Sequence, residues 1–383
     1  MSVSLWLGVN MKKIIISTVG TSLLTNIASK EERTKIYTNS NCSENECDKE
    51  IVELVEKLEK ISFQKLKTSD SLEIKKRLSA ELNGILGFYQ SNPKDAEDIH
   101  YLISTDTMQG IKCANILTNY LSELGYNAQI FTPKSLNTKT KYNFDEGVKE
   151  LISWCDSTLP GYKDSGYQVV FNLTGSFKSL QGYMNTIAMF YADKIIYIFE
   201  STNSELIEIP KLPIKIDTDI FTKFIDKLLL ISAGLNPLVN SVTELPELMF
   251  DVIDKQVTFS VWGELVWQGI KKELLGNNLV ELPSLKYSDK FKKLFTEASQ
   301  IDKIKLQESL AKASKLLIEN KGDLSFLKKD GGLLYENYQN KFEGGVVIGH
   351  FRINQGDRVS CTFKNNELNL RKFGRHDFVN DNP

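Results

Sequence analysis

The chain has 383 residues, of which 41% are hydrophobic and 25% are charged. These proportions are typical of globular proteins, and the length predicts two or three domains. No run of about 18 apolar residues occurs, so we expect no membrane span. Residues 1–10 lack the features of a signal peptide, and we expect them to be an extension without a role in the fold.

The five cysteines have no paired spacing. Cys42 and Cys47 are the nearest pair, and no second pair completes a zinc site. We therefore expect free thiols and a cytoplasmic location.

The net charge of −2 is unevenly distributed. From Pro283 to the end, 18 basic against 13 acidic residues give +5, which leaves 29 against 36, or −7, for the rest. A basic C-terminal segment predicts contact with phosphates, although a solvated lysine-rich helix face would give the same excess.

The first 200 residues alternate between expected strands and helices. Continuous apolar runs, typical of strands buried on both faces of a parallel sheet, occur at residues 13–17, 99–104, 168–173 and 194–199. Helical patterns occur near residues 48–60, 71–90, 108–124 and 177–191. This alternation predicts an α/β fold, with a doubly wound Rossmann-like domain over residues 1–215.

The pattern changes after residue 215. Residues 216–282 are expected to form a helical or winged-helix connector, in which Trp262 and Trp267 are interpreted as core or dimer-packing residues. Residues 283–383 are expected to form an α+β domain. Its predicted elements are a short strand at 284–287, helices at 289–298 and 302–319, and an antiparallel sheet of strands at 346–353, 358–364 and 367–373.

Three of the expected strands end in loops rich in glycine and hydroxyl groups. These loops are Ser17-Thr-Val-Gly-Thr-Ser22, Ser104-Thr-Asp-Thr-Met-Gln-Gly110 and Asn172-Leu-Thr-Gly-Ser-Phe-Lys178. Parallel sheets bind ligands at the carboxyl ends of their strands, and helix N-termini attract phosphate. Ser and Thr are also ordinary helix caps, but three such loops together predict a phosphate-bearing ligand. The usual ATP and NAD fingerprints are absent.

These three loops, together with Ser79-Ala-Glu-Leu-Asn83, resemble the CRISPR-associated Rossmann fold (CARF) family over about residues 11–210. The resemblance implies a homodimer that binds a cyclic oligoadenylate, with cyclic tetra-adenylate expected first, at its two-fold axis. It implies no cofactor besides this activator. The residues that it places at the ligand are Thr18, Gly20, Thr21, Ser22, Ser104, Thr105, Asp106, Thr174, Gly175, Ser176 and Lys178.

Histidine and arginine residues gather near the C-terminus. The candidate catalytic residues are His350, Arg352, Arg358, Arg375 and His376. RNA cleavage by the ribose 2′-hydroxyl needs proton transfer and cations at the phosphate, which histidine and arginine supply. Each residue taken alone could equally be solvated or end a strand. No pattern of metal ligands occurs, so we expect no metal.

Residues 284–383 resemble the RelE/ParE toxin superfamily, through Phe351-Arg-Ile-Asn-Gln-Gly-Asp-Arg358 and Leu370-Arg-Lys-Phe-Gly-Arg-His-Asp377. The resemblance implies a metal-independent RNase that cleaves mRNA in the ribosomal A site. It places Arg358 at the scissile phosphate and His350 where a catalytic lysine is common. Asn380 stands where a tyrosine is usual, which leaves His350 and His376 as alternative general bases.

Together these features predict a homodimeric sensor joined to a nuclease that acts on mRNA at the ribosome, switched by cyclic oligoadenylate. Three alternatives remain. The Trp262 region could form a DNA-binding winged helix of a transcription regulator. The sensor could degrade its own ligand, with Ser176 and Lys178 positioning it. The C-terminal segment could poison gyrase, as ParE relatives do.

Overall fold

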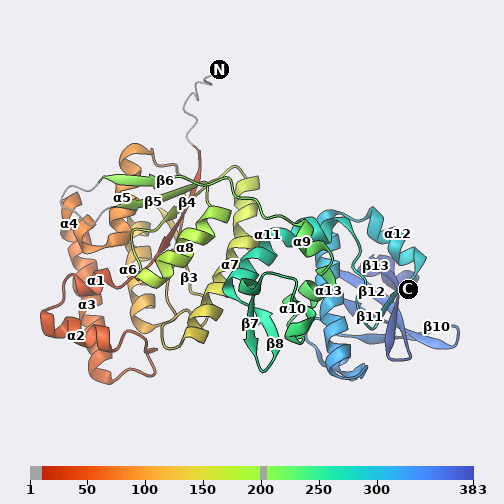
Figure 1. The fold of residues 1–383 in the computed structure, drawn as a ribbon. Coiled ribbons are helices and arrows are strands. Elements are labelled where there is room, and N and C mark those ends of the chain that lie inside the picture. The colour runs from red at the N-terminus through yellow and green to blue at the C-terminus, as the bar shows by residue number, and fades with distance from the viewer. Residues whose placement is uncertain (1–10, 199–204) are drawn as a thin grey trace, which may run out of the picture. The chain divides into compact units, whose positions relative to one another are not determined.

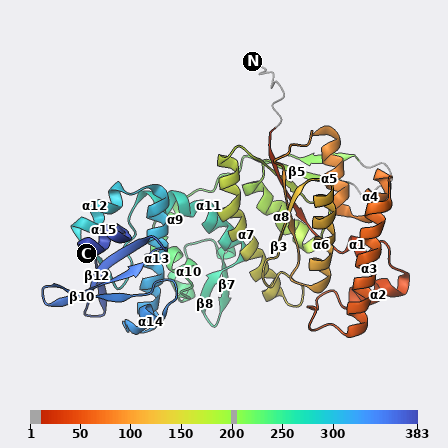
Figure 2. The same ribbon diagram turned by 180° about the vertical axis from the view of Figure 1, so that it is seen from behind.

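The structure, a computed structural model, describes residues 11–198 and 205–383. The first ten residues and Phe199, which ends the fourth predicted strand, lie outside these ranges. The chain forms two compact units, Met1–Lys215 and Ile216–Pro383. The first unit runs from red to yellow-green in Figures 1 and 2, and the second from green to blue. Among the described residues, no helix is both long enough and apolar enough to cross a membrane.

The first unit contains a six-stranded sheet with the strand order β3-β2-β1-β4-β5-β6. The four predicted strands are confirmed as β1 (Lys13–Thr18), β2 (Ile99–Ile103), β4 (Gln168–Asn172) and β5 (Lys194–Ile198). Sequence analysis missed β3 (Asn127–Phe131) and β6 (Leu206–Ile209), because these edge strands are mostly half-exposed and lack a continuous apolar run. All pairings are parallel except that of β5 with β6.

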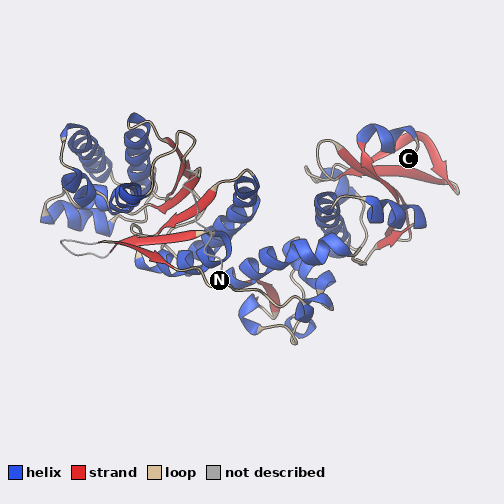
Figure 3. Ribbon diagram, turned by 90° about the horizontal axis from the view of Figure 1, so that it is seen from above, coloured by secondary structure: helices blue, strands red, loops and turns tan. Residues whose placement is uncertain are grey.

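Helices cover both faces of this sheet (Figure 3). The predicted mixed α/β architecture, with a parallel-strand sheet flanked by helices, is confirmed. One predicted helix is divided in two at Ser79, whose side chain accepts the N–H of Leu82 and caps the second part. The helices are α1 (Ser22–Thr25), α2 (Lys30–Thr38), α3 (Lys49–Thr68), α4 (Leu72–Leu78), α5 (Ala80–Ser91), α6 (Met108–Glu123), α7 (Lys141–Asp164) and α8 (Lys178–Tyr191).

The expectation of free thiols is wrong for one pair of cysteines. Cys42 and Cys47 form a disulfide, with their Cα atoms 5.5 Å apart. A turn after α2 brings them together, because the N–H of Cys47 donates to the carbonyl of Ser43 at 3.1 Å. The spacing alone did not reveal this turn. Cys113, Cys155 and Cys361 are buried free thiols.

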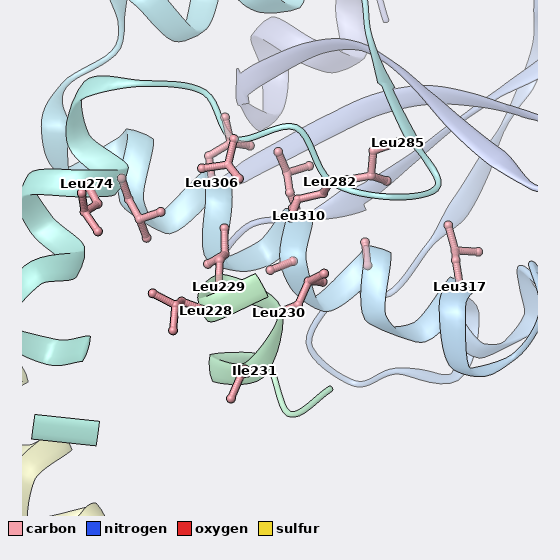
Figure 4. Packing of buried hydrophobic residues seen from close by; sticks show 14 of the residues in the cluster. Leu228, Leu229, Leu230, Ile231, Leu274, Leu282, Leu285, Leu306, Leu310 and Leu317 are labelled. Atoms are coloured by element: carbon pink, nitrogen blue, oxygen red, sulfur yellow. The ribbon is translucent and has the colours of Figure 1, made fainter. Parts of the chain in front are cut away.

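The second unit begins with a mainly helical segment, in which a short hairpin precedes the last helix. Its elements are α9 (Asp219–Thr222), α10 (Ile225–Ser232), the 3-10 turns η1 (Val239–Ser241) and η2 (Glu247–Met249), the hairpin β7 (Phe250–Ile253) and β8 (Gln256–Phe259), and α11 (Val261–Asn277). Trp267 on α11 is buried in the core. A single hydrophobic cluster joins this segment to the C-terminal part of the chain (Figure 4). For example, it contains Leu228, Leu274, Leu306 and Leu310.

The C-terminal part of this unit carries a separate five-stranded sheet, ordered β10-β11-β12-β13-β9. Four strands are antiparallel, and β9 pairs in parallel with β13. The elements are β9 (Leu285–Tyr287), α12 (Asp289–Glu297), α13 (Gln300–Glu319), α14 (Ser325–Lys329), β10 (Glu336–Glu343), β11 (Val346–Arg352), β12 (Asp357–Lys364), β13 (Glu367–Arg375) and α15 (His376–Asp381). The predicted helices and strands are present, whereas β10, α14 and α15 were not predicted.

Candidate functional site

In the first unit, β1 and β4 are neighbours although β2 and β3 lie between them in the sequence. The strand order reverses here, and open α/β sheets bind ligands at the carboxyl ends of strands where this happens. The loops that follow β1 and β4 are in contact. The Thr18 hydroxyl donates to the carbonyl of Gly175 at 2.9 Å. A Cβ on Gly20 would lie 3.2 Å from the nitrogen of Ser176, so this close approach favours glycine.

Glu81, at the start of α5, contacts both loops. Its carboxylate accepts the N–H of Gly20 at 2.7 Å and the hydroxyls of Ser79 and Ser22 at 2.6 and 3.2 Å. A Cβ on Gly175 would come within 2.2 Å of its Oε1 atom, so only glycine fits there. The side chain is completely buried, and this burial raises its pKa.

The β4 loop offers polar groups that have no hydrogen-bond partner among the described residues. Ser176 has a φ of 109°, a conformation unusual for a residue with a side chain. The hydroxyl oxygens of Thr174 and Ser176 are buried atoms without a hydrogen-bond partner in the described structure. No side chain caps the N-terminus of α8, where Lys178 is exposed. Unpaired hydroxyls, a helix N-terminus and a lysine together can hold an anionic group.

The β2 loop is different, because Ser104, Thr105 and Asp106 have hydrogen-bond partners nearby. Ser104 shares a hydrogen bond with Thr132 at 2.6 Å, and Asp106 accepts the N–H of Ser135 at 2.9 Å. Both partners lie in the loop after β3. Thr105 bonds to Thr107, which caps α6. Thr107 therefore acts as a helix cap, whereas no side chain among the described residues caps α8.

The structure thus brings together the predicted residues of the β1 and β4 loops. Thr21 and Ser22 start α1, beside Gly20. Glu81 and Asn172 belong to the segments that resemble the CARF family, but neither was predicted as a site residue. The amide of Asn172 donates to the Ser17 hydroxyl and the Glu81 carbonyl, both at 3.1 Å. A carboxylate within the apolar stripe of α5 was the signal that could have identified Glu81.

In the second unit, a polar row crosses one face of the sheet. Glu336, His350, Ser360 and Lys372 are cross-strand partners on β10, β11, β12 and β13. Arg352 pairs with Arg358 in the next row on the same face. The opposite face carries the buried side chains of Phe351, Val359 and Phe373, which join the hydrophobic core.

Arg358 lies at the edge of this polar face and is only 6% exposed. One guanidinium nitrogen donates to the carbonyls of Asn354 and Asp357 at 2.9 and 3.1 Å, while Nε has no partner in the described structure. Arg358 also lowers the pKa of His350, although burial of the imidazole contributes most to this shift. His350 is therefore held neutral at pH 7 and can accept a proton.

Arg375 does not lie beside His350, Arg352 and Arg358. It pairs with Asp357, 3.7 Å away, and its side chain is 83% exposed. Because adjacent residues on a strand point to opposite faces, Asp357 and Arg375 lie on the other side of the sheet from Arg358. The expected convergence of Arg375 with His350 and Arg358 is therefore not seen.

His376 is the first residue of α15 and directly follows β13. Its ring nitrogen Nε2 accepts from the amide nitrogen of Asn380 at 2.8 Å, and Nδ1 bonds to the carboxylate of Asp377 at 2.9 Å. Buried Lys372 donates to the carbonyl of Asn382 at 3.2 Å and so anchors α15 to the sheet. The described residues contain no group of three or more His, Cys, Asp or Glu side chains placed to hold a metal ion.

One comparison with known proteins bears on the first unit. Residues 76–212 match the family model described as CRISPR-associated protein (Cas_APE2256). The match extends from the end of α4 to just beyond β6 and includes Glu81, Asn172 and the β4 loop. It supports a CRISPR-associated protein.

Proposed function

We propose that this protein is a cyclic-oligoadenylate-activated, metal-independent endoribonuclease that cleaves mRNA on the ribosome in type III CRISPR antiviral defence. It acts as a cytoplasmic homodimer. The match of residues 76–212 to a CRISPR-associated family supports the sensing half of this proposal. The observation that carries the nuclease half is the gathering of His350, Arg352 and Arg358 on one face of the C-terminal sheet.

In the sensor, the β1 and β4 loops would bind the phosphates of the ring. The uncapped N-terminus of α8, Lys178 and the unpaired hydroxyls of Thr174 and Ser176 supply the groups for this. A cyclic ligand on a two-fold axis would meet the same groups from both protomers. It activates the nuclease only if it binds the active arrangement of the dimer more tightly than the inactive one.

In the nuclease, neutral His350 would take the proton of the ribose 2′-hydroxyl. Arg352 and Arg358 would stabilise the charge that develops on the phosphate. The ribosome would orient the mRNA for in-line attack, which the small set of groups on this face does not ensure. The product would carry a 2′,3′-cyclic phosphate.

The test is mRNA cleavage by the full chain, with and without ribosomes and with and without cyclic tetra-adenylate. We expect cleavage only when both are present. His350→Gln and Arg358→Ala should each slow it about 100-fold or more. Arg375→Ala is the matched control, because this arginine lies on the other face of the sheet, and it should retain most of the activity. Equal losses in Arg358→Ala and Arg375→Ala would contradict the assignment of this face.

Each alternative predicts a distinct result. Binding to a specific DNA duplex, with no RNA cleaved, would favour a transcription regulator. Loss of the cyclic ligand on incubation would favour a ring nuclease. Inhibition of gyrase in the absence of ribosomes would favour a ParE-like activity.

A further inference from the structure

We call His350, Arg352, Arg358, His376 and Asn380 the polar cluster of the second unit. Tyr338 contacts this cluster from β10, a strand that was not predicted from the sequence. The ring of Tyr338 on β10 packs on the imidazole of His350, with 4.5 Å between ring centroids. Its hydroxyl donates to Oδ1 of Asn380 on α15 at 2.5 Å. Tyr338 therefore touches both histidine-bearing elements of the cluster, directly at His350 and through Asn380 at His376.

The backbone of β10 places Tyr338 there by leaving the regular sheet. Asn337 pairs with Gly349 and Phe342 with Val347, so residues 338–341 lie opposite Ile348 alone. Asn340 has a φ of 57° within this bulge. Such bulges re-aim side chains, often next to functional sites. A second residue of the bulge, Lys341, donates to the carbonyl of Asn380 at 2.6 Å and fixes the same contact.

The hydrogen bonds orient the phenol. Oδ1 of Asn380 can only accept, so the Tyr338 hydroxyl must be the donor. Asn380 is then left to donate through its amide nitrogen to the His376 ring at 2.8 Å. The other side chains of β10 are exposed, apart from half-buried Lys341. Contacts with polar groups of the cluster, and not burial in the core, therefore hold Tyr338 in place.

The protonation states of the neighbouring rings are complementary. Burial raises the pKa of Tyr338 to about 12, so the phenol keeps its proton at neutral pH. Burial lowers the pKa of His350, so the imidazole is free of a second proton. A proton donor and a proton acceptor thus lie side by side beside Arg358.

We propose that Tyr338 is a catalytic residue that gives its proton to the leaving 5′-oxygen of the cleaved RNA. This inference rests on the nuclease activity proposed above. His350 takes the proton of the 2′-hydroxyl, and the 2′-oxygen forms a bond to phosphorus. The bond from phosphorus to the 5′-oxygen breaks, its electron pair stays on that oxygen, and Tyr338 protonates it. The phenolate and the imidazolium then return to neutrality by proton exchange with water.

The experiment uses Tyr338→Phe in the full chain, with cyclic tetra-adenylate and ribosomes. This change keeps the ring on His350 and removes only the hydroxyl. Two mRNAs are compared, one ordinary and one with sulfur in place of the leaving 5′-oxygen at the cleaved linkage. A thiolate leaves without a proton, so the sulfur substrate does not need the donor. Tyr335→Phe is the matched control, because Tyr335 is buried and packs its hydroxyl against Gly349, outside the cluster.

We expect Tyr338→Phe to cleave ordinary mRNA about 100-fold or more slowly than wild type and the sulfur substrate within a few-fold of the wild-type rate. His350→Gln should stay slow on both, and Tyr335→Phe should match wild type on both. Full activity of Tyr338→Phe on ordinary mRNA would overturn the inference. An equal loss on both substrates would also overturn it, because Tyr338 would then only position its neighbours. If wild type cleaves neither substrate, the proposed nuclease function itself fails.

Discussion

Glu81 allows the ligand site to be tested through two substitutions with opposite consequences. In Glu81→Gln, the remaining oxygen can still accept the N–H of Gly20, and the hydroxyls of Ser22 and Ser79 can turn to accept from the new amide group. In Glu81→Leu, all three donors lose their acceptor. The first change removes only the ionisable group, whereas the second also removes the hydrogen bonds that anchor the β1 loop to α5.

The magnitudes follow from burial. The N–H of Gly20 has no rotational freedom, so leaving it unpaired in Glu81→Leu should lower the free energy of unfolding by about 1–3 kcal/mol. Glu81→Gln should cost less than this. Because burial raises the pKa of Glu81, the folded protein holds its proton more tightly than the unfolded chain does. Wild type should therefore gain stability relative to Glu81→Gln as the pH falls from 7 towards 4.5.

Urea unfolding at several pH values measures these differences, and calorimetry with cyclic tetra-adenylate measures ligand binding. Glu81→Leu should bind the ring more weakly than wild type, because the β1 loop loses its anchor. Glu81→Gln should bind it at least as tightly, because the amide can keep the hydrogen bond from Gly20 and never carries a negative charge near the phosphates. If Glu81→Leu matched wild type in both assays, our account of how the β1 loop is held would be refuted.

Three further predictions concern the first unit. Lys178→Ala should weaken binding of cyclic tetra-adenylate about 10- to 100-fold. Lys49→Ala should not, because the Lys49 side chain, at the start of α3, is 91% exposed and lies outside the candidate site. Unchanged calorimetric affinity of Lys178→Ala would remove Lys178 from the site. In analytical ultracentrifugation the protein should be a dimer that binds one ring per two chains, and a monomer binding one ring per chain would argue against the two-fold pocket. His100 is completely buried, which lowers its pKa to about 3. As the pH falls from 6.5 towards 3, only the unfolded chain takes up this proton, so unfolding should become easier by up to ~1.4 kcal/mol per pH unit. In urea unfolding from pH 7 to 5, His100→Gln should lack this contribution to the pH dependence of the free energy of unfolding.

Sequence patterns identified the elements that have a buried face. The fully buried strands β1 and β4 and the helices α6 and α8 were predicted for this reason. The strand β10 was missed because all its side chains are exposed or half-exposed, so no apolar alternation marks it. Pairing with β11 holds β10 in place, and the sequence of β10 alone does not indicate this pairing.

In the candidate sites too, local features could be predicted from the sequence and tertiary contacts could not. Loops at strand ends could be predicted because parallel strands place their carboxyl ends at one edge. Which loops share their hydrogen bonds could not, and Asp106 proved to bond with the loop after β3. The positions of Tyr338 and Arg375 depend on a bulge and on strand register, and Glu81 enters its site from a helix far away in the sequence. These placements depend on tertiary packing.

The proposed nuclease reaction is best tested by cleavage of a ribosome-bound mRNA with one 2′-deoxy substitution at the cleaved linkage, in EDTA and with cyclic tetra-adenylate. The attacking group in the proposed reaction is the RNA's own 2′-hydroxyl, and no divalent metal takes part. We predict that unsubstituted mRNA is cleaved in EDTA to a 2′,3′-cyclic phosphate and that the substituted mRNA stays intact. Hexamminecobalt, which EDTA does not chelate, replaces the magnesium that ribosomes require. Cleavage of the deoxy-substituted linkage, or a product with a 5′-phosphate, would contradict the account.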